Sequence, residues 1–181
     1  MDIDKIDKVK LLEIISKVYE RSEGKDITLY AIGGTALTLL DLKDASKDID
    51  FIINRGDWDF VGEILNELSK EYSIRIDRFF NGWMVGYWLP DDFREKSLDL
   101  TIINNLKIES PYLIDLLITK LIANRLQDRK DIEPILENYF DLVQTETIDR
   151  LVEYTFNNPK EGRERKELIK EFIRERLRRI D

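Results

Sequence analysis

The sequence predicts an α+β fold, in which a mixed β-sheet flanked by helices is followed by a C-terminal helical bundle. Two observations support this prediction. Short apolar runs of strand length alternate with amphipathic helical segments up to Ile103, whereas only helical periodicity continues after Asn104-Asn105. We therefore expect a sheet-containing domain over residues 1–109 and a helical region over residues 110–181.

The first part of the chain alternates between the two periodicities. Apolar positions at helical spacing predict helices over residues 3–22, 35–42 and 57–72. Short apolar runs predict strands over residues 27–32, 48–54, 74–80, 83–89 and 98–103. Asn81-Gly82 has the composition of a two-residue hairpin turn, so we expect the strands on either side of it to pair. We interpret Trp83, Tyr87 and Trp88 as core and lid packing, with a base-stacking surface as the alternative.

The remainder of the chain is predicted to be helical. Helical spacing indicates segments over residues 112–126, 130–140, 146–156 and 160–180, with Ser110-Pro111 at the start of the first. The last stretch, Asn158–Asp181, holds nine basic and six acidic residues. We interpret it as a solvated helix with Glu/Arg pairs at helical spacing, and a surface for nucleic acid or a protein partner is the alternative.

The composition argues against several kinds of chemistry. The chain contains no cysteine and no histidine, which excludes disulfides, thiolate catalysis, histidine general bases and the usual zinc sites. Any metal must be held by oxygen ligands, which favours Mg²⁺ or Mn²⁺. The net charge of -8 argues against a broadly basic nucleic-acid coat. No apolar run approaches the ~20 residues of a membrane span and no signal peptide opens the chain, so we expect a cytoplasmic protein without membrane contact.

Two aspartates flank a single isoleucine in the strand predicted over residues 48–54. Because strand side chains alternate between faces, Asp48 and Asp50 point the same way and repel each other unless a cation lies between them. Asp99, between two leucines in a later predicted strand, offers a third carboxylate. Three such groups can hold two Mg²⁺ ions, which activate an attacking oxygen and stabilise a leaving phosphate. We therefore expect Asp48, Asp50 and Asp99 to be metal ligands and catalytic residues.

A glycine pair stands at the junction of a predicted strand and a predicted helix. Gly33 and Gly34 have no side chains, so a triphosphate can approach the backbone there, and the N–H groups that start a helix attract anions. Thr35 can donate its hydroxyl to a phosphate or cap the helix. Phosphoryl-type transfer needs mainly positioning and charge neutralisation, so it does not require histidine.

These motifs together resemble the signature of the nucleotidyltransferase superfamily that includes DNA polymerase beta. The resemblance rests on Gly33-Gly34, Asp48-Ile49-Asp50 and Leu98-Asp99-Leu100. In that superfamily the aspartates bind metal ions and the glycine turn contacts the nucleotide phosphates. The wider stretch Gly33–Leu37, followed by Ser46–Phe51, is similar to the abortive-infection-type nucleotidyltransferase toxins and their uncharacterised prokaryotic relatives.

A second block resembles the same branch. The helix predicted over residues 112–126 looks like the one that brings a lysine to the site in those relatives, and Lys130–Glu133 resembles the charged element that follows. The resemblance implies that Lys120 binds nucleotide phosphates and that Asp131 orients the site. Pro134 departs from the pattern, because relatives often have a second aspartate there.

The resemblance implies metal-dependent transfer of a nucleoside monophosphate from a nucleoside triphosphate to an acceptor hydroxyl, with pyrophosphate leaving. The acceptor stays open between a tRNA end, a hydroxyl side chain of another protein and a small molecule. The toxin resemblance favours tRNA and implies an antitoxin partner, whereas the acidic net charge argues against tRNA. The alternatives are a non-catalytic nucleotide-binding or antitoxin-type module of the same fold, and an aminoglycoside-type nucleotidyltransferase, whose relatives commonly have tryptophan where this chain has Thr35.

Overall fold

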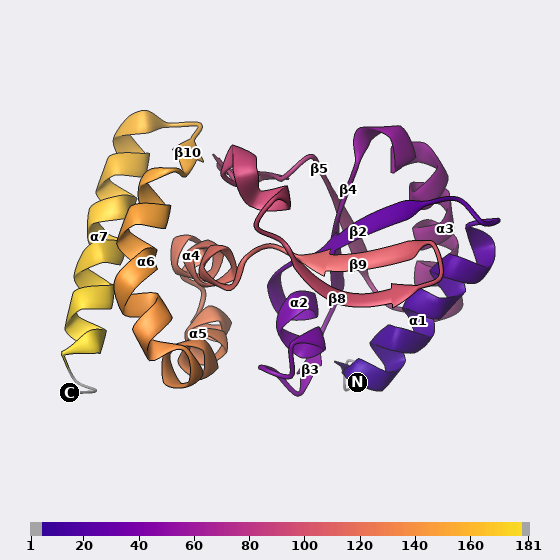
Figure 1. Ribbon diagram of the computed structural model, residues 1–181, viewed down its shortest axis with the longest axis horizontal. Helices are drawn as coiled ribbons and strands as arrows, with labels where there is room; N and C mark the ends of the chain where they lie inside the picture. The colour runs from indigo at the N-terminus through magenta and orange to yellow at the C-terminus, as the bar shows by residue number, and fades with distance from the viewer. Residues whose placement is uncertain (1–4, 179–181) are drawn as a thin grey trace. The chain divides into compact units, whose positions relative to one another are not determined.

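The computed structural model describes residues 5–178 and separates into two compact units. The first unit comprises the chain up to Gly82 together with Lys96–Pro111, and the second comprises Trp83–Glu95 together with the chain from Tyr112 onwards. The second unit therefore contains an early segment besides the helical region that we expect from residue 110. Figure 1 labels elements of both units, among them β2, β4 and β9 of the first and α4–α7 of the second. Within residues 5–178, no helix has the length and apolar character needed to cross a membrane.

A five-stranded mixed sheet forms the centre of the first unit. Its strands, in spatial order, are β5 (Ile76–Phe80), β4 (Ile49–Ile53), β2 (Ile27–Ala31), β9 (Leu106–Ser110) and β8 (Leu98–Ile103). β4 runs antiparallel to β2 and parallel to β5, while β9 runs parallel to β2 and antiparallel to β8. Together with the helices around it, this mixture of pairings confirms the predicted α+β class.

Helices and a short strand pair complete this unit. They are α1 (Lys8–Arg21), α2 (Gly33–Leu39), α3 (Trp58–Glu71) and a 3₁₀ turn (Arg55–Asp57), with β1 (Ile6–Asp7) paired to β3 (Ala45–Ser46). The Asp7 carboxylate accepts a hydrogen bond from the backbone N–H of Lys10 at 2.9 Å, which caps α1. Residues 3 and 4 of the first predicted helix, and 179 and 180 of the last, lie outside the described residues.

One face of β5 is covered by α3. A β-carbon built on Gly62 of α3 would collide with the guanidinium of Arg78, so the absent side chain makes room for that arginine. The Arg78 guanidinium lies 4.7 Å from the ring centroid of Trp58, and the Trp58 ring packs edge-on against Phe80. Because side chains alternate along a strand, the intervening residues of β5 point to the opposite face.

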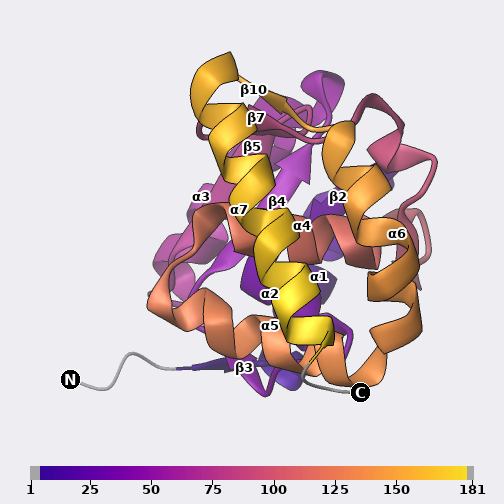
Figure 2. The ribbon, with the colours of Figure 1, turned by 90° about the vertical axis from the view of Figure 1, so that its left-hand side faces the viewer.

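The second unit combines helices with a small antiparallel sheet. The helices are α4 (Leu113–Ala123), α5 (Leu126–Asn138), α6 (Phe140–Val152) and α7 (Pro159–Leu177), with a 3₁₀ turn at Asp91–Arg94. The sheet has the order β10 (Thr155–Phe156), β7 (Tyr87–Trp88), β6 (Trp83–Met84). α7 packs beside α6, as Figures 1 and 2 show. The helices predicted beyond residue 110 are thus present, but α6 begins at Phe140 instead of residue 146, and Thr155–Phe156, predicted as helix, form β10.

Two predictions about strand pairing are wrong. The sequence predicts no strand after Asn104-Asn105, yet β9 follows directly and pairs on both sides, with β2 and with β8. Asn81-Gly82 does not close a hairpin, because β5 pairs with β4 whereas β6 pairs with β7 around Val85-Gly86. In both cases a neighbouring strand distant in sequence decides the pairing, and local turn chemistry does not reveal it.

Two smaller expectations are also corrected. Ser110 ends β9 and α4 begins at Leu113, so Pro111 lies before the helix instead of in its first turn. Tyr87 is buried as the core interpretation requires, but Trp83 and Trp88 are 38% and 40% exposed. The core interpretation of the aromatic segment therefore holds for Tyr87 alone.

A buried arginine ties the segments of the second unit together. Arg150 of α6 donates from Nε and Nη2 to the two carboxylate oxygens of Asp115 in α4, at 2.8 and 2.7 Å. Its Nη1 donates to Asp92 at 2.6 Å, and the Tyr154 hydroxyl donates to Asp115 at 3.0 Å. One guanidinium thus joins α4, α6 and the early Trp83–Glu95 segment. Each of its hydrogen bonds is charge-assisted, and the pair to Asp115 is bidentate.

We expect Arg150→Gln to lower the free energy of unfolding of the second unit by about 3–5 kcal/mol, because the buried Asp115 carboxylate loses its bidentate partner. Urea unfolding followed by circular dichroism measures the loss. Arg174→Gln on the exposed surface of α7 is the matched control and should change stability by less than about 0.5 kcal/mol. A similarly small loss in Arg150→Gln would mean that this network does not hold the unit together.

Candidate functional site

A glycine turn joins β2 to α2. Gly33 has a φ of +57°, a left-handed conformation that residues with side chains rarely adopt. A β-carbon built on Gly33 would stand 3.4 Å from Oδ2 of Asp50, so the turn lies directly beside that carboxylate. At Gly34 a β-carbon would stand 2.7 Å from Oγ of Ser46, closer than packing allows. Gly34 therefore lets β3 approach α2, whereas Gly33 opens the backbone next to Asp50.

Hydrogen bonds of the Thr35 side chain link the start of α2 to the start of β4. Its buried hydroxyl accepts a hydrogen bond from the backbone N–H of Asp50 at 2.9 Å and donates to the backbone oxygen of Asp48 at 3.4 Å. The backbone N–H of Ile32 also donates to the Asp50 carbonyl, at 3.1 Å. The hydroxyl that we considered for phosphate binding or helix capping thus holds the glycine turn against the backbone of the two aspartates.

A further acidic residue lies beside Asp50. In the parallel register of β4 and β5, Asp50 pairs with Asp77, and paired residues on neighbouring strands point to the same face of a sheet. Asp48 stands immediately before β4 and is half-buried. Asp77 is not among the residues predicted from the sequence. The sequence does contain a signal for it, because Asp77 is an acidic residue in a strand-like run with the apolar Ile76, Phe79 and Phe80.

Arg75 provides a cation to one of these carboxylates. Its Nη2 lies 2.5 Å from Oδ2 of Asp77. The hydrogen bond to Asp77 and then the Asp77 charge raise the pKa of Arg75 against the opposing effect of desolvation, and the charges of Asp48 and Asp50 add smaller contributions in the same direction. The charges of all three carboxylates thus raise the pKa of one guanidinium. This corner of the sheet is therefore a region of negative potential that favours cations.

Asp99 lies on the same face of the sheet but far from that corner. Asp99 of β8 pairs with Glu109 of β9, Glu109 with Tyr30 of β2, and Tyr30 with Ile52 of β4. Three strand-to-strand spacings therefore separate β8 from β4. At ~4.8 Å between neighbouring strands this separation is about 14 Å, too far for Asp99 and Asp50 to share an ion. The structure therefore does not bring Asp99 together with the other two predicted aspartates.

Lys107 already neutralises the surroundings of Asp99. Its ammonium lies 2.8 Å from Oδ1 of Asp99 and 2.5 Å from Oε1 of the buried Glu109. Ser97 donates to the other carboxylate oxygen of Glu109. Hydrogen bonds to Asp99 and Glu109 raise the pKa of Lys107, so it remains a cation. Asp99 is thus part of an ion-pair cluster on β8 and β9.

The donor set at the β4–β5 corner suits a hard cation. Asp48, Asp50 and Asp77 offer carboxylate oxygens, and the chain has no histidine or cysteine to favour a softer metal. Within residues 5–178, no three acidic side chains stand close enough to form a ready-made metal site. These residues therefore fit a metal that keeps other oxygen ligands, as Mg²⁺ does when one or two carboxylates and substrate phosphates hold it.

A separate cluster in the second unit surrounds Lys120. The Lys120 ammonium is buried and lies 2.6 Å from Oδ2 of Asp131 and 3.1 Å from Oδ1 of Asp128. The predicted pair, Lys120 and Asp131, is thus in direct contact, whereas Asp128 was not predicted. Burial alone would raise the pKa of Asp128, but hydrogen bonds from Arg125 and Lys120 leave that pKa below its usual range. The contacts with two aspartates and the burial of Lys120 thus hold its ammonium in one position.

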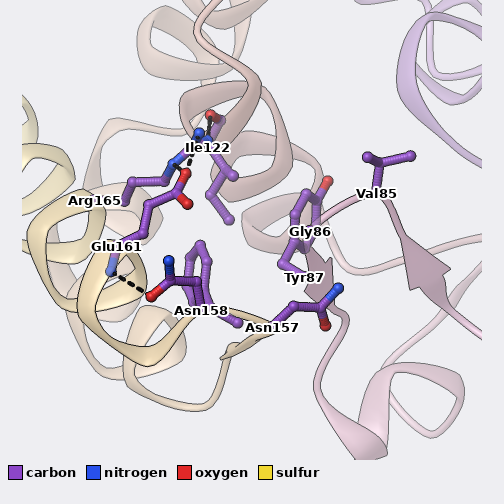
Figure 3. A pocket seen from close by; sticks show the side chains of 9 residues that line it. Val85, Gly86, Tyr87, Ile122, Asn157, Asn158, Glu161 and Arg165 are labelled. Atoms are coloured by element: carbon purple, nitrogen blue, oxygen red, sulfur yellow. Dashed lines mark hydrogen bonds and ion pairs between the residues drawn. The ribbon is translucent and has the colours of Figure 1, made fainter.

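The second unit also contains an open pocket of about 110 Å³ (Figure 3). The β6–β7 turn, the end of α4, β10 and the first turns of α7 supply its lining residues, among them Tyr87, Phe156 and Asn157. Arg165 of this lining donates to Glu161 at 2.9 Å and to the Ile122 carbonyl at 2.8 Å. Because its guanidinium is already neutralised, the pocket wall offers little attraction for a phosphate.

The match to a known protein family extends over both units of the chain. A family model described as "Nucleotidyltransferase of unknown function (DUF6036)" matches residues 9–177. That range includes the glycine turn, the β4–β5 corner and the Lys120 cluster. The chain has no significant match to a curated protein or to a solved structure. Since the match extends over most of its length, the chain belongs to this family of nucleotidyltransferases of unknown function.

Proposed function

We propose that this protein transfers a nucleoside monophosphate from a nucleoside triphosphate to an acceptor hydroxyl, in a reaction that depends on Mg²⁺ or Mn²⁺. The observation that carries the proposal is the contact between Gly33 and Asp50. A phosphate bound against the open backbone of Gly33 lies beside a carboxylate, and two anions at that distance require a cation between them. Membership of a nucleotidyltransferase family supports the same class of reaction.

In this proposal the β4–β5 corner holds the cation. Asp48 and Asp50 are its ligands, and Asp77 takes the role of third carboxylate that we expected of Asp99. When bound, the cation neutralises the triphosphate and stabilises the leaving pyrophosphate. Gly33 leaves room for the phosphates at the backbone, and a carboxylate of the same corner can receive the proton of the acceptor hydroxyl.

Thr35 completes the proposed machinery of the first unit, and Lys120 is the residue that we propose to act in the second unit. Thr35 acts as a positioning residue, because its hydroxyl fixes the glycine turn to the backbone of Asp48 and Asp50. Lys120 binds the nucleotide phosphates, and Asp131 orients its ammonium through their 2.6 Å contact. A lysine held by buried aspartates loses little conformational freedom when it meets its ligand, which favours this role.

Two alternatives concern the acceptor and the chemistry. A tRNA end is the proposed acceptor, with an antitoxin as the protein partner of a toxin-like enzyme, while a protein hydroxyl or a small molecule would indicate another branch. A module that binds nucleotide without transferring it is the other class. Labelled nucleoside triphosphates offered with Mg²⁺ and total tRNA discriminate these classes: label in RNA, label in protein, or nucleotide binding without transfer.

We expect Asp50→Asn to lower transfer by about 10²–10³-fold, because the carboxylate beside the glycine turn can no longer hold the cation. Incorporation of label from each nucleoside triphosphate into total tRNA or protein, with Mg²⁺ present and then removed by chelator, measures the effect. Asp26→Asn, an exposed loop aspartate of the same unit, is the control and should keep full activity. Equal activity in the two variants would remove the proposed site.

The third carboxylate can be tested by a direct comparison. We expect Asp77→Asn to lower transfer by about 10-fold or more, because a carboxylate next to the cation is lost, and Asp99→Asn to change it by less than about threefold. Steady-state rates at several Mg²⁺ concentrations separate weaker metal binding from slower turnover. The reverse ranking of the two variants would restore Asp99 to the site and exclude Asp77.

We expect Lys120→Met to weaken nucleotide binding by about 10–100-fold, because a charge-assisted contact to phosphate is worth about 1.5–3 kcal/mol. Equilibrium binding of a fluorescent nucleotide with Mg²⁺ measures the change. Lys130→Met, an exposed lysine on α5, is the matched control. Thermal unfolding of both variants shows whether the buried Asp128 and Asp131 tolerate the loss of their partner, and a folded Lys120→Met protein with unchanged affinity would contradict the assignment.

A further inference from the structure

The cations of α7 gather on one flank of the helix. At about 100° of rotation per residue, six basic residues and Glu167 fall within about 120° of its circumference. The basic residues, all exposed or half-buried and here called the basic flank, are Lys160, Arg163, Lys166, Lys170, Arg174 and Arg178. Four acidic residues occupy the adjacent flank: Glu161, Glu164, Glu171 and Glu175. Apart from Glu167, the glutamates in the described part of α7 therefore lie beside the basic flank and not on it.

Ion pairs leave most of the basic flank uncompensated. Lys170 of the basic flank forms a salt bridge with Glu167 at 2.7 Å. Burial and then the neighbouring Lys170 charge lower the pKa of Lys166, as crowded cations do. The arginines outside the flank are paired instead, Arg165 with Glu161 and Arg176 with Glu133. The flank thus stays positive in a protein of net charge -8.

The length of the flank suits a polyanion. From Lys160 to Arg178 the helix advances about 27 Å, at 1.5 Å per residue. Duplex nucleic acid presents about one phosphate charge per 1.7 Å of its axis, so a line of cations of this length meets many phosphates at once. An acidic protein surface has no comparable regular row of anions, and this difference favours nucleic acid as the partner.

Two exposed tryptophans of the same unit add a second kind of contact. Trp83 and Trp88 pair across β6 and β7 with ring centroids 6.4 Å apart, and they are 38% and 40% exposed. Thr155 of β10 pairs with Trp88, so these three residues share the outer face of the small sheet, whereas Tyr87 on its inner face is buried. Unpaired bases stack on such rings with little regard to sequence.

We propose that the basic flank of α7 binds the phosphate backbone of a nucleic acid and that Trp83 and Trp88 stack its unpaired bases. A molecule with both features, such as a folded RNA with single-stranded ends, is then the acceptor of the transfer reaction. The identity of the acceptor rests on the proposed function, but the binding does not, because it needs neither metal nor nucleoside triphosphate.

Fluorescence anisotropy with a labelled, unmodified tRNA transcript tests the flank between about 50 and 200 mM salt. Arg163→Gln/Arg174→Gln removes two exposed cations without loss of helix propensity. We expect weaker binding and a slope of log affinity against log salt that is shallower by about 1.4–1.8, as expected for two lost phosphate contacts. Lys10→Gln/Lys70→Gln, on α1 and α3 of the first unit, is the matched control and should change neither quantity.

A labelled single-stranded RNA oligonucleotide tests the tryptophans. We expect Trp88→Leu to weaken its binding by about tenfold, in keeping with the loss of one stacked base. Phe172→Leu removes another exposed aromatic ring of the same unit and should leave the affinity unchanged. Equal effects of these two substitutions would remove the stacking role.

The outcomes separate this inference from the proposed function. No binding of tRNA by the unmodified protein at about 50 mM salt, or equal losses in the two double variants, overturns the inference. Equal competition by polyglutamate assigns the flank to an acidic protein and also overturns it. Flank-dependent RNA binding without transfer of label from any nucleoside triphosphate supports the inference and removes the proposed function. Transfer of label to a small molecule without RNA binding supports the proposed function and overturns the inference.

Discussion

The hydrogen bonds of the Thr35 hydroxyl are the interaction on which the candidate site depends. They join the first turn of α2 to the backbone of Asp48 and Asp50, and so hold a left-handed glycine beside a carboxylate. Sheet order makes this possible: β2 is antiparallel to β4, so the chain leaves β2 at the edge where β4 begins. β5 is parallel to β4 and begins at that edge too, which brings Asp77 beside Asp50. Topology therefore places Asp77 beside Asp50, at the corner where Asp48 precedes β4.

Much of this arrangement could be predicted from the sequence, because it depends on local patterns. Helical periodicity locates α1 and α3, since their buried stripes recur at the spacing of the helix. The glycine turn and the isoleucine between Asp48 and Asp50 are equally local signals. Pairing between distant strands is not local. β9 alternates buried Leu106 and Ile108 with the charged Lys107, a pattern that is stable as a strand only because β2 and β8 lie on either side.

The misplacement of Asp99 follows from the same limit. Asp99 and Asp77 both lie in strands with apolar neighbours, and no periodicity distinguishes them. What distinguishes them is strand order, because β5 lies next to β4 whereas β9 and β2 separate β8 from it. The counter-ions reflect this difference: Asp99 has the ammonium of Lys107, while Asp77 has the guanidinium of Arg75, which also senses Asp48 and Asp50. A carboxylate can be assigned to a metal site only when its strand neighbours are known.

The distribution of charge matters more here than its sum. A net charge of -8 disfavours anionic substrates, yet nucleoside triphosphates and nucleic acids are both strongly anionic. The buried cations cannot supply general attraction, because Arg150 is compensated by Asp115 and Lys120 by Asp128 and Asp131. Long-range attraction must come from exposed cations, and α7 gathers these on one flank while four of its glutamates occupy the adjacent flank. Screening limits the reach of each charge to roughly 8–10 Å at ordinary ionic strength, so a local row of cations can bind a polyanion although the whole protein repels it.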